Sequence, residues 1–474
     1  MGSYSRTAYM AIKIETTENT AVKPTTFIPL MSEDIVTEWG AVPATPVSGN
    51  RSMNLRAIQT AIAPPSGTIS LLAEPKTVGY FLKAVFGAVS TGRYFPISAV
   101  TGTFVVGETV TGGTSAATAT VIAVSAENDY LIMGAPTGTF TVTGEALTGG
   151  TSAATATLGT NAATVYGHEF KAPQSTLPTF TVEFGFDDKA YRYTGVRFNA
   201  FNSVAQGDNI ITLELAFMAR AEFKHARVTA ITSSGAGAKT ITVDQTTGLA
   251  ASDTVKIFRP STGAFIDFVS AAVKTHTVNA VVTETTFTVT NLETATAVGD
   301  LVMLAPQTPS YTLDKEFSWI GGSTVKMSTT ETLALAATAE CIEDFEIVLT
   351  NELEARHCAS GVNVVNRFPS KLLLKSLDGS GSLTKVYVDD TFLDRLRNST
   401  SMALQVKHVG GQIASTGVYY TLDWRVPSLI FDAFNPSISS EDLLNQEMPY
   451  KIYYSSTSGY LAKALLITDV TAYT

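Results

Sequence analysis

The stretch from residue 179 to 219 contains three runs, TFTVEFGF (Thr179–Phe186), AYRYTGVRFNAF (Ala190–Phe201) and NIITLELAFMA (Asn209–Ala219). Within each run, apolar or aromatic residues alternate with polar ones, which is the period-two pattern of a β-strand with one buried face. The pairs Asp187-Asp188 and Gly207-Asp208 separate the runs, and residues of these types favour turns. This stretch therefore predicts three consecutive strands joined by turns.

Residues 305–474 show a similar order. DFEIVLTNEL (Asp344–Leu353) precedes a segment of helical type, and three strand-like runs follow it: ALQVKHV (Ala403–Val409), YYTLDWRV (Tyr419–Val426) and KALLITDV (Lys463–Val470). The likeness to the first block lies in the pattern rather than in identical residues. We infer two copies of one fold.

Each block also contains one segment with the signs of a short helix. TVGYFLKAVF (Thr77–Phe86) lies between Pro75 and Gly87, and proline near a helix start with glycine after its end is the usual asymmetry. TFLDRLRN (Thr391–Asn398) follows Asp389-Asp390, which we interpret as an N-terminal cap.

Residues 97–163 form a first insertion, with no Lys or Arg and only Glu108, Glu127, Asp129 and Glu145 as charged residues. The insertion holds a direct repeat, TGTFVVGETVTGGTSAATATV (101–121) and TGTFTVTGEALTGGTSAATATL (137–158). Each copy places strand-forming residues around a Gly-Gly pair, which is typical of a hairpin. Two copies are too few for a solenoid, so we predict a compact surface module.

Residues 227–304 form a second insertion that is also doubled, with TITVDQTTGLAASDTVKI (Thr240–Ile257) parallel to FTVTNLETATAVGDLVML (Phe287–Leu304). We expect another small β module. The sequence thus divides into residues 1–96 with 164–226, the insertion 97–163, the insertion 227–304, and residues 305–474. The predicted fold class is mainly β: two β-sandwich domains, each with a flanking helix, and two small inserted modules.

Composition limits the function classes. The chain has 474 residues, 45% of them hydrophobic and 16% charged, with a net charge of −10. Proteins that grip nucleic acid need clustered Lys and Arg, so tight DNA binding is not expected. The most hydrophobic stretch, Val78–Val89, is interrupted by Lys83 and Gly87, and Met1–Lys13 has no secretory pattern. We therefore expect no membrane span and synthesis in the cytoplasm.

The sequence offers no constellation of catalytic or metal-binding residues. The histidines at 168, 225, 276, 357 and 408 lack metal-ligand spacing, and Cys341 and Cys358 are expected as free thiols. SGAGAKT (Ser234–Thr240) lacks the Gly-Lys pair of a phosphate-binding loop. Acidic pairs such as Glu343-Asp344 are interpreted as turns rather than as acid/base catalysts. We expect no enzyme activity and no cofactor.

Several segments resemble the tail tube (major tail) proteins of long-tailed bacteriophages. They are ETTENTAVKPTTFIPLMSEDI (Glu15–Ile35), PPSGTISLLAEP (Pro64–Pro75), FLKAVFG (81–87), GHEFKAP (Gly167–Pro173), TFTVEFGF and YRYTGVRFNAFNSV, together with the GETVTGGTSAATAT type of repeat. The likeness covers about two-thirds of the chain, an estimate from the order of these segments, and rests on order and pattern. It implies a β-sandwich with a flanking helix whose long hairpins join neighbouring subunits into a ring with an inner barrel.

The resemblance also implies partners. Rings would stack around the tape-measure protein, end at tail terminator and tail tip proteins, and let DNA pass without specific binding. Most such subunits carry one tube domain and form hexamers, whereas two domains in one chain would suit a trimer with pseudo-sixfold symmetry. The expected location is the virion tail, of the non-contractile (siphophage) kind, with the inserted modules outside.

The charges of two segments bear on contacts between subunits. Residues 305–474 carry 19 acidic and 13 basic residues, and residues 1–96 carry 6 acidic and 8 basic ones, so opposite charges are available for subunit contacts.

The alternative function is that of a modular surface adhesin or carbohydrate-binding protein, which would expose aromatic residues in loops. Trp39, Trp319 and Trp424 instead lie in or beside strand-like segments, where we expect them in the core.

Overall fold

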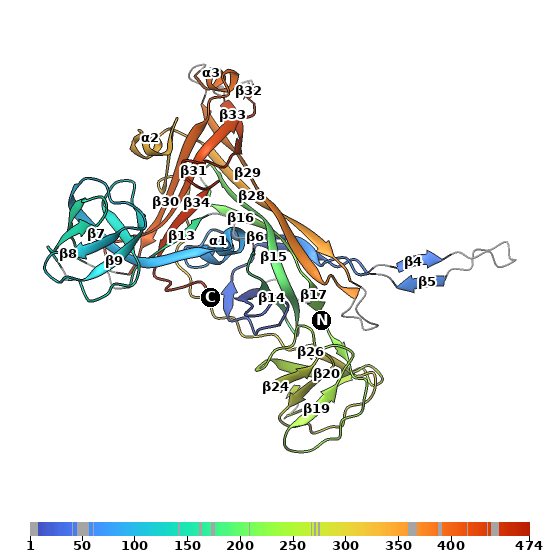
Figure 1. Cartoon of the computed structure of the whole chain (residues 1–474). Helices are drawn as coiled ribbons and strands as arrows, with labels where there is room; N and C mark the ends of the chain where they lie inside the picture. Colours follow the sequence, from blue (N-terminus) through green and yellow to red (C-terminus); the bar gives the residue numbers. More distant parts are fainter. Residues whose placement is uncertain are drawn as a thin grey trace.

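The computed structural model describes residues 8–39, 41–44, 56–59, 61–140, 143–160, 164–171, 176–207, 209–266, 268–269, 272–273, 275–358, 367–386, 391–414, 416–433, 435–437 and 445–474. Strands make up 52% of the structure and helices 5%, so the predicted mainly β class is confirmed. Figure 1 shows a central body of long strands from which two small lobes and one hairpin project.

The two predicted helices are confirmed, and a third short one is present. They are α1 (Val78–Phe86), α2 (Glu331–Ala336) and α3 (Thr391–Arg397). At the end of α1, Gly87 has φ +77° and its N–H donates to the carbonyl of Lys83. A side chain at this φ would be strained, which explains the glycine. The proposed cap of α3, Asp389-Asp390, lies outside the described residues.

The central body is built on a run of eight antiparallel strands in two sets of four. The first four-strand unit has the order β3 (Ser32–Val36), β6 (Ser66–Leu72), β16 (Thr212–Met218), β15 (Lys189–Gln206). The second has the order β28 (Asp344–Arg356), β29 (Lys371–Val386), β33 (Asn445–Ile452), β31 (Tyr419–Phe431). Pairing of β15 with β28 joins the two units into one sheet.

The neighbours of each unit also correspond. β15 carries β14 (Phe180–Phe186) and β17 (Ala221–Phe223), just as β31 carries β30 (Met402–Gln412) and β34 (Lys463–Thr468). Helix α1 follows β6, and α3 follows β29. The same order of elements and pairings thus occurs twice in the chain. The predicted turn at Asp187-Asp188 is confirmed, because Phe186 pairs with Lys189.

Residue identities support this correspondence once the strands are superposed by register. β6 reads SGTISLL (66–72), and the end of β29 reads SGSLTKV (380–386). A Cβ on Gly67 would lie 1.9 Å from the backbone oxygen of Asp34, and a Cβ on Gly381 would lie 2.1 Å from that of Glu346. Asp34 and Glu346 occupy the same position of β3 and β28. Glycine is therefore required at both places by the same close backbone approach.

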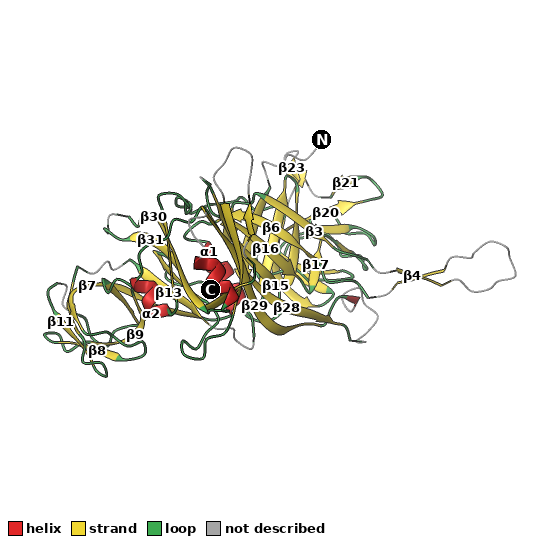
Figure 2. Cartoon of the chain, turned by 90° about the horizontal axis from the view of Figure 1, so that it is seen from above, coloured by secondary structure: helices red, strands yellow, loops and turns green. Residues whose placement is uncertain are grey.

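One hydrophobic core serves both units. Phe86 of α1 and Phe201 of β15 both lie against Trp424 of β31, with ring centroids 6.4 and 5.7 Å apart. Seven further strands complete or extend the body: β1 (Tyr9–Ile14), β2 (Thr26–Ile28), β13 (Tyr166–Lys171), β27 (Ser323–Ser328), β32 (Asn435–Ser437) and the projecting hairpin β4 (Ala41–Ala44) with β5 (Arg56–Gln59). Figure 2 shows this hairpin and the lobe of the first insertion at opposite ends of the molecule.

The first insertion is a closed barrel. Its strands are β7 (Val89–Thr101), β8 (Thr109–Gly112), β9 (Thr118–Val124), β10 (Tyr130–Met133), β11 (Ala146–Gly149) and β12 (Thr155–Leu158). They pair in the cycle β7-β12-β11-β8-β9-β10-β7, around a core of their own. The hairpins predicted at the two Gly-Gly pairs are confirmed as β8–β9 and β11–β12. We call these strands the first barrel.

The sequence repeat gives the first barrel a reciprocal pair of buried carboxylates. Glu108 in the first copy accepts hydrogen bonds from the backbone N–H groups of Thr151 (3.1 Å) and Ser152 (2.9 Å) in the second copy. Glu145 in the second copy accepts from those of Thr114 (3.1 Å) and Ser115 (2.6 Å) in the first. Burial opposes the charge on Glu108, but the donors of Ser152 and Val105 outweigh it, so its pKa is lowered. Each copy therefore fastens the loop of the other.

The second insertion is also a closed barrel, which we call the second barrel. Its strands are β18 (Ala226–Arg227), β19 (Lys239–Thr242), β20 (Thr254–Arg259), β24 (His276–Thr283), β25 (Thr286–Val289) and β26 (Leu301–Leu304), with the short β21 (Ala264–Phe265), β22 (Phe268–Val269) and β23 (Ala272–Val273) between β20 and β24. Their cycle is β18-β26-β20-β24-β25-β19, closed by a bridge between Val228 and Val243.

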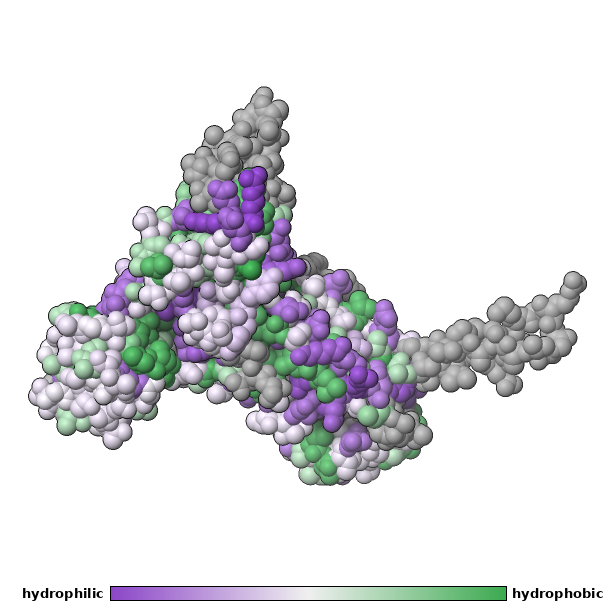
Figure 3. Space-filling view, turned by 45° about the horizontal axis from the view of Figure 1, so that its top comes forward, coloured by the Kyte–Doolittle hydropathy of each residue, from purple (hydrophilic) through white to green (hydrophobic). Residues whose placement is uncertain are grey.

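The surface of the first-barrel lobe differs from that of the body. Figure 3 shows the lobe of the first barrel mostly in white, whereas strongly hydrophilic residues gather on the central body. This agrees with the absence of Lys and Arg from residues 97–163. Because both barrels are closed, their described residues present no long open strand edge to other molecules.

We predict that Glu108→Gln weakens the opposite copy of the repeat. Glutamine keeps one acceptor oxygen and loses the charge, so the amides of Thr151 and Ser152 lose part of their bonding, at a cost of about 1–3 kcal/mol in local stability. Hydrogen exchange should accelerate at residues 151–152, whereas Glu145→Gln should accelerate it at residues 114–115. Equal effects of both variants at both loops would contradict the reciprocal arrangement.

Candidate assembly interface and junction network

The joint between the two four-strand units is an edge-to-edge strand pairing. Seven residue pairs form it, from Ala200 opposite Thr350 to Gln206 opposite Asp344. Across the joint, Asn202 Nδ2 donates a hydrogen bond to Glu346 Oε1 (2.8 Å). The backbone N–H of Gly207 donates to Asp344 Oδ1 (3.0 Å). Phe201, Ile347 and Leu349 are fully buried beneath the joint. The joint therefore combines backbone, polar and apolar contributions.

The two ends of the eight-strand run have no such neighbour. In the described part of the chain, β3 pairs only with β6, and β32, which continues β31 along β33, pairs only with β33. Val36 in β3 is 55% exposed. Val348, at the same position of β28, is half-buried because β28 pairs with β15 as well as with β29. Open edges of this kind are templates for further strand pairing.

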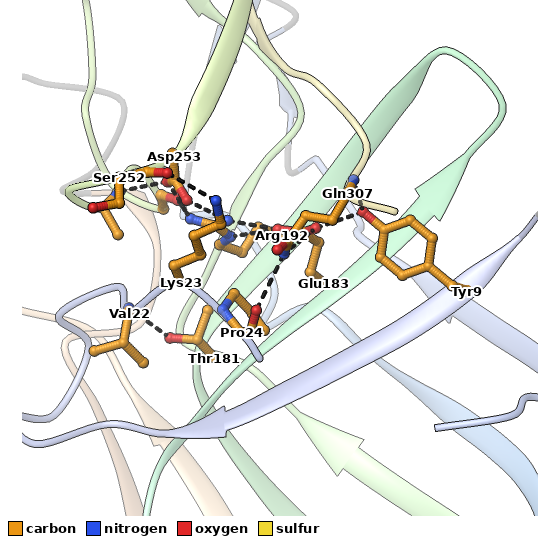
Figure 4. Close-up of polar contacts among 12 residues, drawn as sticks. Tyr9, Val22, Lys23, Pro24, Thr181, Glu183, Arg192, Ser252, Asp253 and Gln307 are labelled. Carbon is orange, nitrogen blue, oxygen red and sulfur yellow. Dashed lines mark hydrogen bonds and ion pairs between the residues drawn. The ribbon is translucent and has the colours of Figure 1, made fainter. Parts of the chain in front are cut away.

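A second site is the buried charge network that ties the second barrel to the body (Figure 4). Arg192 of β15 lies between two carboxylates, donating to Glu183 of β14 (2.5 Å) and to Asp253 of the second barrel (2.5 and 2.9 Å). It also donates to the carbonyl of Gly248 (2.8 Å). All three charged side chains are about 1% exposed, so water does not screen their attraction.

The network extends to the start of the chain. Tyr9 donates to Glu183 Oε1 (2.7 Å), and Gln307 donates to the same oxygen (3.0 Å). Burial and the neighbouring Glu183 carboxylate raise the pKa of Tyr9. Burial disfavours the charge of Arg192, but Asp253 and Glu183 outweigh it and raise its pKa. The arrangement keeps Tyr9 neutral and Arg192 charged, which is the state that holds three segments together.

The doubled sequence of the second barrel explains how Asp253 is positioned. Asp253 accepts from the N–H of Ala250 (2.6 Å), and Asp300, its counterpart in the other copy, accepts from that of Ala297 (2.8 Å). Arg259 binds Asp300 through two nitrogens at 3.0 and 2.8 Å. Both copies thus build the same aspartate turn. One turn is used inside the barrel, and the other is used to attach it to the body.

The histidines singled out in the sequence are spread over the molecule. His168 lies between Thr91 and the carbonyl of Val470, His408 bonds Ser323 Oγ, and His357 lies beside the carbonyl of Ile62. No group of three or more potential metal ligands occurs within the residues that the structure covers. Cys341 and Cys358 are free and exposed.

Other sequence candidates also receive structural explanations. After SGAGAKT the chain enters strand β19 rather than the helix that a phosphate-binding loop requires. Asp344, from the acidic pair Glu343-Asp344, belongs to the joint. No helix in the described ranges is both long and apolar enough to span a membrane.

The prediction for the tryptophans is confirmed at two positions and wrong at the third. Trp319 and Trp424 are buried, whereas Trp39 is 53% exposed. Trp39 follows the edge strand β3, beyond the body's core, and its ring makes a T-shaped contact with Phe368 (6.1 Å between centroids). The alternation of residues around it indicates a strand but does not say that the strand is at an edge.

The sequence contained one signal for the joint that pattern analysis missed. FNAFNSV (198–204) lies near the end of β15, and FDAFNPS (431–437) extends from the last residue of β31 to the last residue of β32. The register agrees, because Asn202 pairs with Glu214 of β16 and Asn435 pairs with Glu447 of β33, at equivalent positions. Comparing the two blocks residue by residue would have found this identity.

We predict that Arg192→Met detaches the second barrel from the body. The change leaves Glu183 and Asp253 buried without their cation, which typically costs about 3–5 kcal/mol. Hydrogen exchange should accelerate in β14 and β15 and at residues 248–253. The matched control Arg259→Met breaks the equivalent pair inside the barrel. It should loosen the loop at 297–300 and leave β14 protected, and loss of protection there would contradict the assignment.

We also predict that the protein loses stability as pH falls from about 6.5 toward 4. Burial lowers the pKa of His408 to about 3 and that of His168 to about 4, so both are neutral when folded and take up a proton on unfolding below pH 6.5. Their contribution is complete above pH 6.5 and declines toward the folded pKa. Urea midpoints at pH 7.5 and 5.5 should differ, and His408→Gln should reduce the difference. An unchanged difference would contradict the prediction.

Comparison with known proteins supplies no family for the chain. No family model matches it, and no curated protein matches it. Its function is therefore inferred from the joint, the open edges and the sequence features described above.

Proposed function

We propose that the chain is the structural subunit of a bacteriophage tail tube. Copies assemble into rings, and the rings stack into a hollow conduit for DNA around the tape-measure protein. In this proposal the two repeated sets of elements are tail-tube-type β-sandwich domains with flanking helices α1 and α3. The two barrels are inserted modules that decorate the outside of the tube.

One observation carries the proposal. The chain contains two copies of one strand unit, joined edge to edge by β15 and β28, and among the described residues the corresponding edges at both ends are open. A contact that joins unit one to unit two can be repeated between unit two and the next chain. Such head-to-tail contacts generate a ring when the rotation closes. Closure into one shared barrel also removes the hazard of open edges.

Two further features support barrels on the outside of the tube and a conduit that does not bind DNA tightly. The barrels close on themselves and attach through buried contacts such as Arg192 with Asp253, so they add bulk without offering strand edges. The net charge of −10 repels phosphates rather than holding them. We therefore propose a subunit of a non-contractile tail, located in the virion, with DNA passing through the lumen without specific binding. Tail terminator and tail tip proteins would close its two ends.

The test is electron microscopy of the purified protein in negative stain over a range of concentrations. We expect rings or tubes with a central hole, and Val36→Lys should abolish them because a charge on the open edge prevents pairing. Val282→Lys on β24 is the matched control, since Val282 is 58% exposed and Val36 is 55% exposed. It should assemble normally. A compact monomer at high concentration would refute the proposal.

A further inference from the structure

The joint inside the chain is a template for a second joint between chains. Residues 198–204, near the end of β15, correspond to 431–437, and β28 begins with residues 344–350, which correspond by register to 32–38. Each strand of the internal joint thus has a counterpart that lies at an open end of the run. The two counterparts are β32 and β3.

Residue types at these open ends agree with the template. Asn202 and Glu346, which bond across the internal joint, correspond to Asn435 and Asp34. Ile347 and Val348 correspond to Ile35 and Val36, so DIV in β3 repeats EIV in β28. The side chains of Ser32, Glu33, Asp34 and Val36 are exposed in the isolated chain, whereas the corresponding positions in β28 are buried or half-buried.

We propose that β32 of one chain pairs antiparallel with β3 of the next, with Asn435 opposite Val36 and Ser437 opposite Asp34. This inference rests on the proposed ring and specifies its partner, a second copy of the chain, and its register. Each ring then holds three chains with six equivalent joints, three internal and three between chains, if the ring has the pseudo-sixfold symmetry of its units.

Pro436 distinguishes the new joint from its template. It replaces Ser203, which lies opposite Ile347 in the internal joint. The N–H of Asp432 donates to the carbonyl of Pro449 (2.8 Å), so residues 449 and 447 of β33 direct their backbone groups toward β31 and β32, and Gln446 directs its groups toward β29. Pro436 lies opposite Gln446 in a non-hydrogen-bonded pair, so its carbonyl oxygen faces the open edge, where proline has no N–H to offer. The joint between chains therefore has one donor fewer than the internal joint. Proline on an edge is also a known means of blunting premature strand pairing.

The backbone pattern makes the proposed register accessible to disulfide trapping. Since residue 436 faces the open edge, residue 435 belongs to a non-hydrogen-bonded pair on that side, in which opposite side chains lie closest. Cysteines at 435 and 36 are then within the Cβ separation that a disulfide needs. The native Cys341 and Cys358, both exposed, are first replaced by serine.

The experiment compares three double-cysteine variants of the full chain under mild oxidation. Val36→Cys with Asn435→Cys should give covalent dimers and trimers, with a ladder that ends at the trimer. Ser32→Cys with Asn435→Cys is the control, because four residues displace the thiols by about 13 Å, and it should give at least tenfold less product. Asn202→Cys with Val348→Cys, at the internal joint, should cross-link within one chain only.

The outcomes separate this inference from the proposed function. Rings that form in the microscope without preferential cross-linking of residues 36 and 435 would overturn the register and leave the tube intact. Absence of rings would overturn both. Pro436→Ser gives a second measure, since restoring the donor should lower the concentration needed for assembly about fivefold. No change or a rise in that concentration would contradict the assignment of residue 436 to the joint.

Discussion

The architecture depends on the hydrogen-bonding requirement of strand edges. A sheet ends in a row of backbone N–H and C=O groups that need partners, and this chain satisfies them in different ways in different places. The inserted modules close into barrels, and the first four-strand unit meets the second through β15 and β28. In the part of the chain that the structure describes, β3 and β32 keep one open edge each, and they are the counterparts of the two strands that pair in the internal joint. The proposed assembly follows from the same requirement that shapes the fold.

The insertions illustrate how modules can be added to a chain without disturbing the strand pairing of its central sheet. Each barrel arises from a duplicated sequence and fastens its own loops with buried carboxylates, Glu108 and Glu145 in one and Asp253 and Asp300 in the other. A buried carboxylate that accepts several backbone N–H groups is well compensated, whereas one without a cation or donors would be costly. Asp253 differs from Asp300 in its cation, because it binds Arg192 of the central body whereas Asp300 binds Arg259 of the barrel itself. The turn at Asp253 therefore attaches the second barrel to the body.

Local patterns were predictable from the sequence, and distant pairings were not. Strands 180–186, 189–206 and 212–218 and helix α1 follow from alternation, Pro75 and Gly87, because these signals act between neighbours in the chain. The meeting of Arg192 with Asp253, or of Ala200 with Thr350, is decided by tertiary packing that periodicity does not encode. Trp39 was expected in the core because alternation does not distinguish an edge strand from a central one. The repeat FNAFNSV and FDAFNPS did carry the information, as residue identity rather than as pattern.

Duplication within one chain changes the energetics of the proposed ring. The internal joint forms between segments already tethered, so it pays no cost for bringing two molecules together, while each joint between chains does. Six units supplied as three chains need three such associations instead of six. The internal joint, with Ser203 at its centre, can form during folding of the chain, and the joint at Pro436, with one donor fewer, can form only when the local concentration of subunits is high. In the proposed ring, a weaker second joint would place polymerisation after folding and would keep the open edges of an unassembled chain from pairing early.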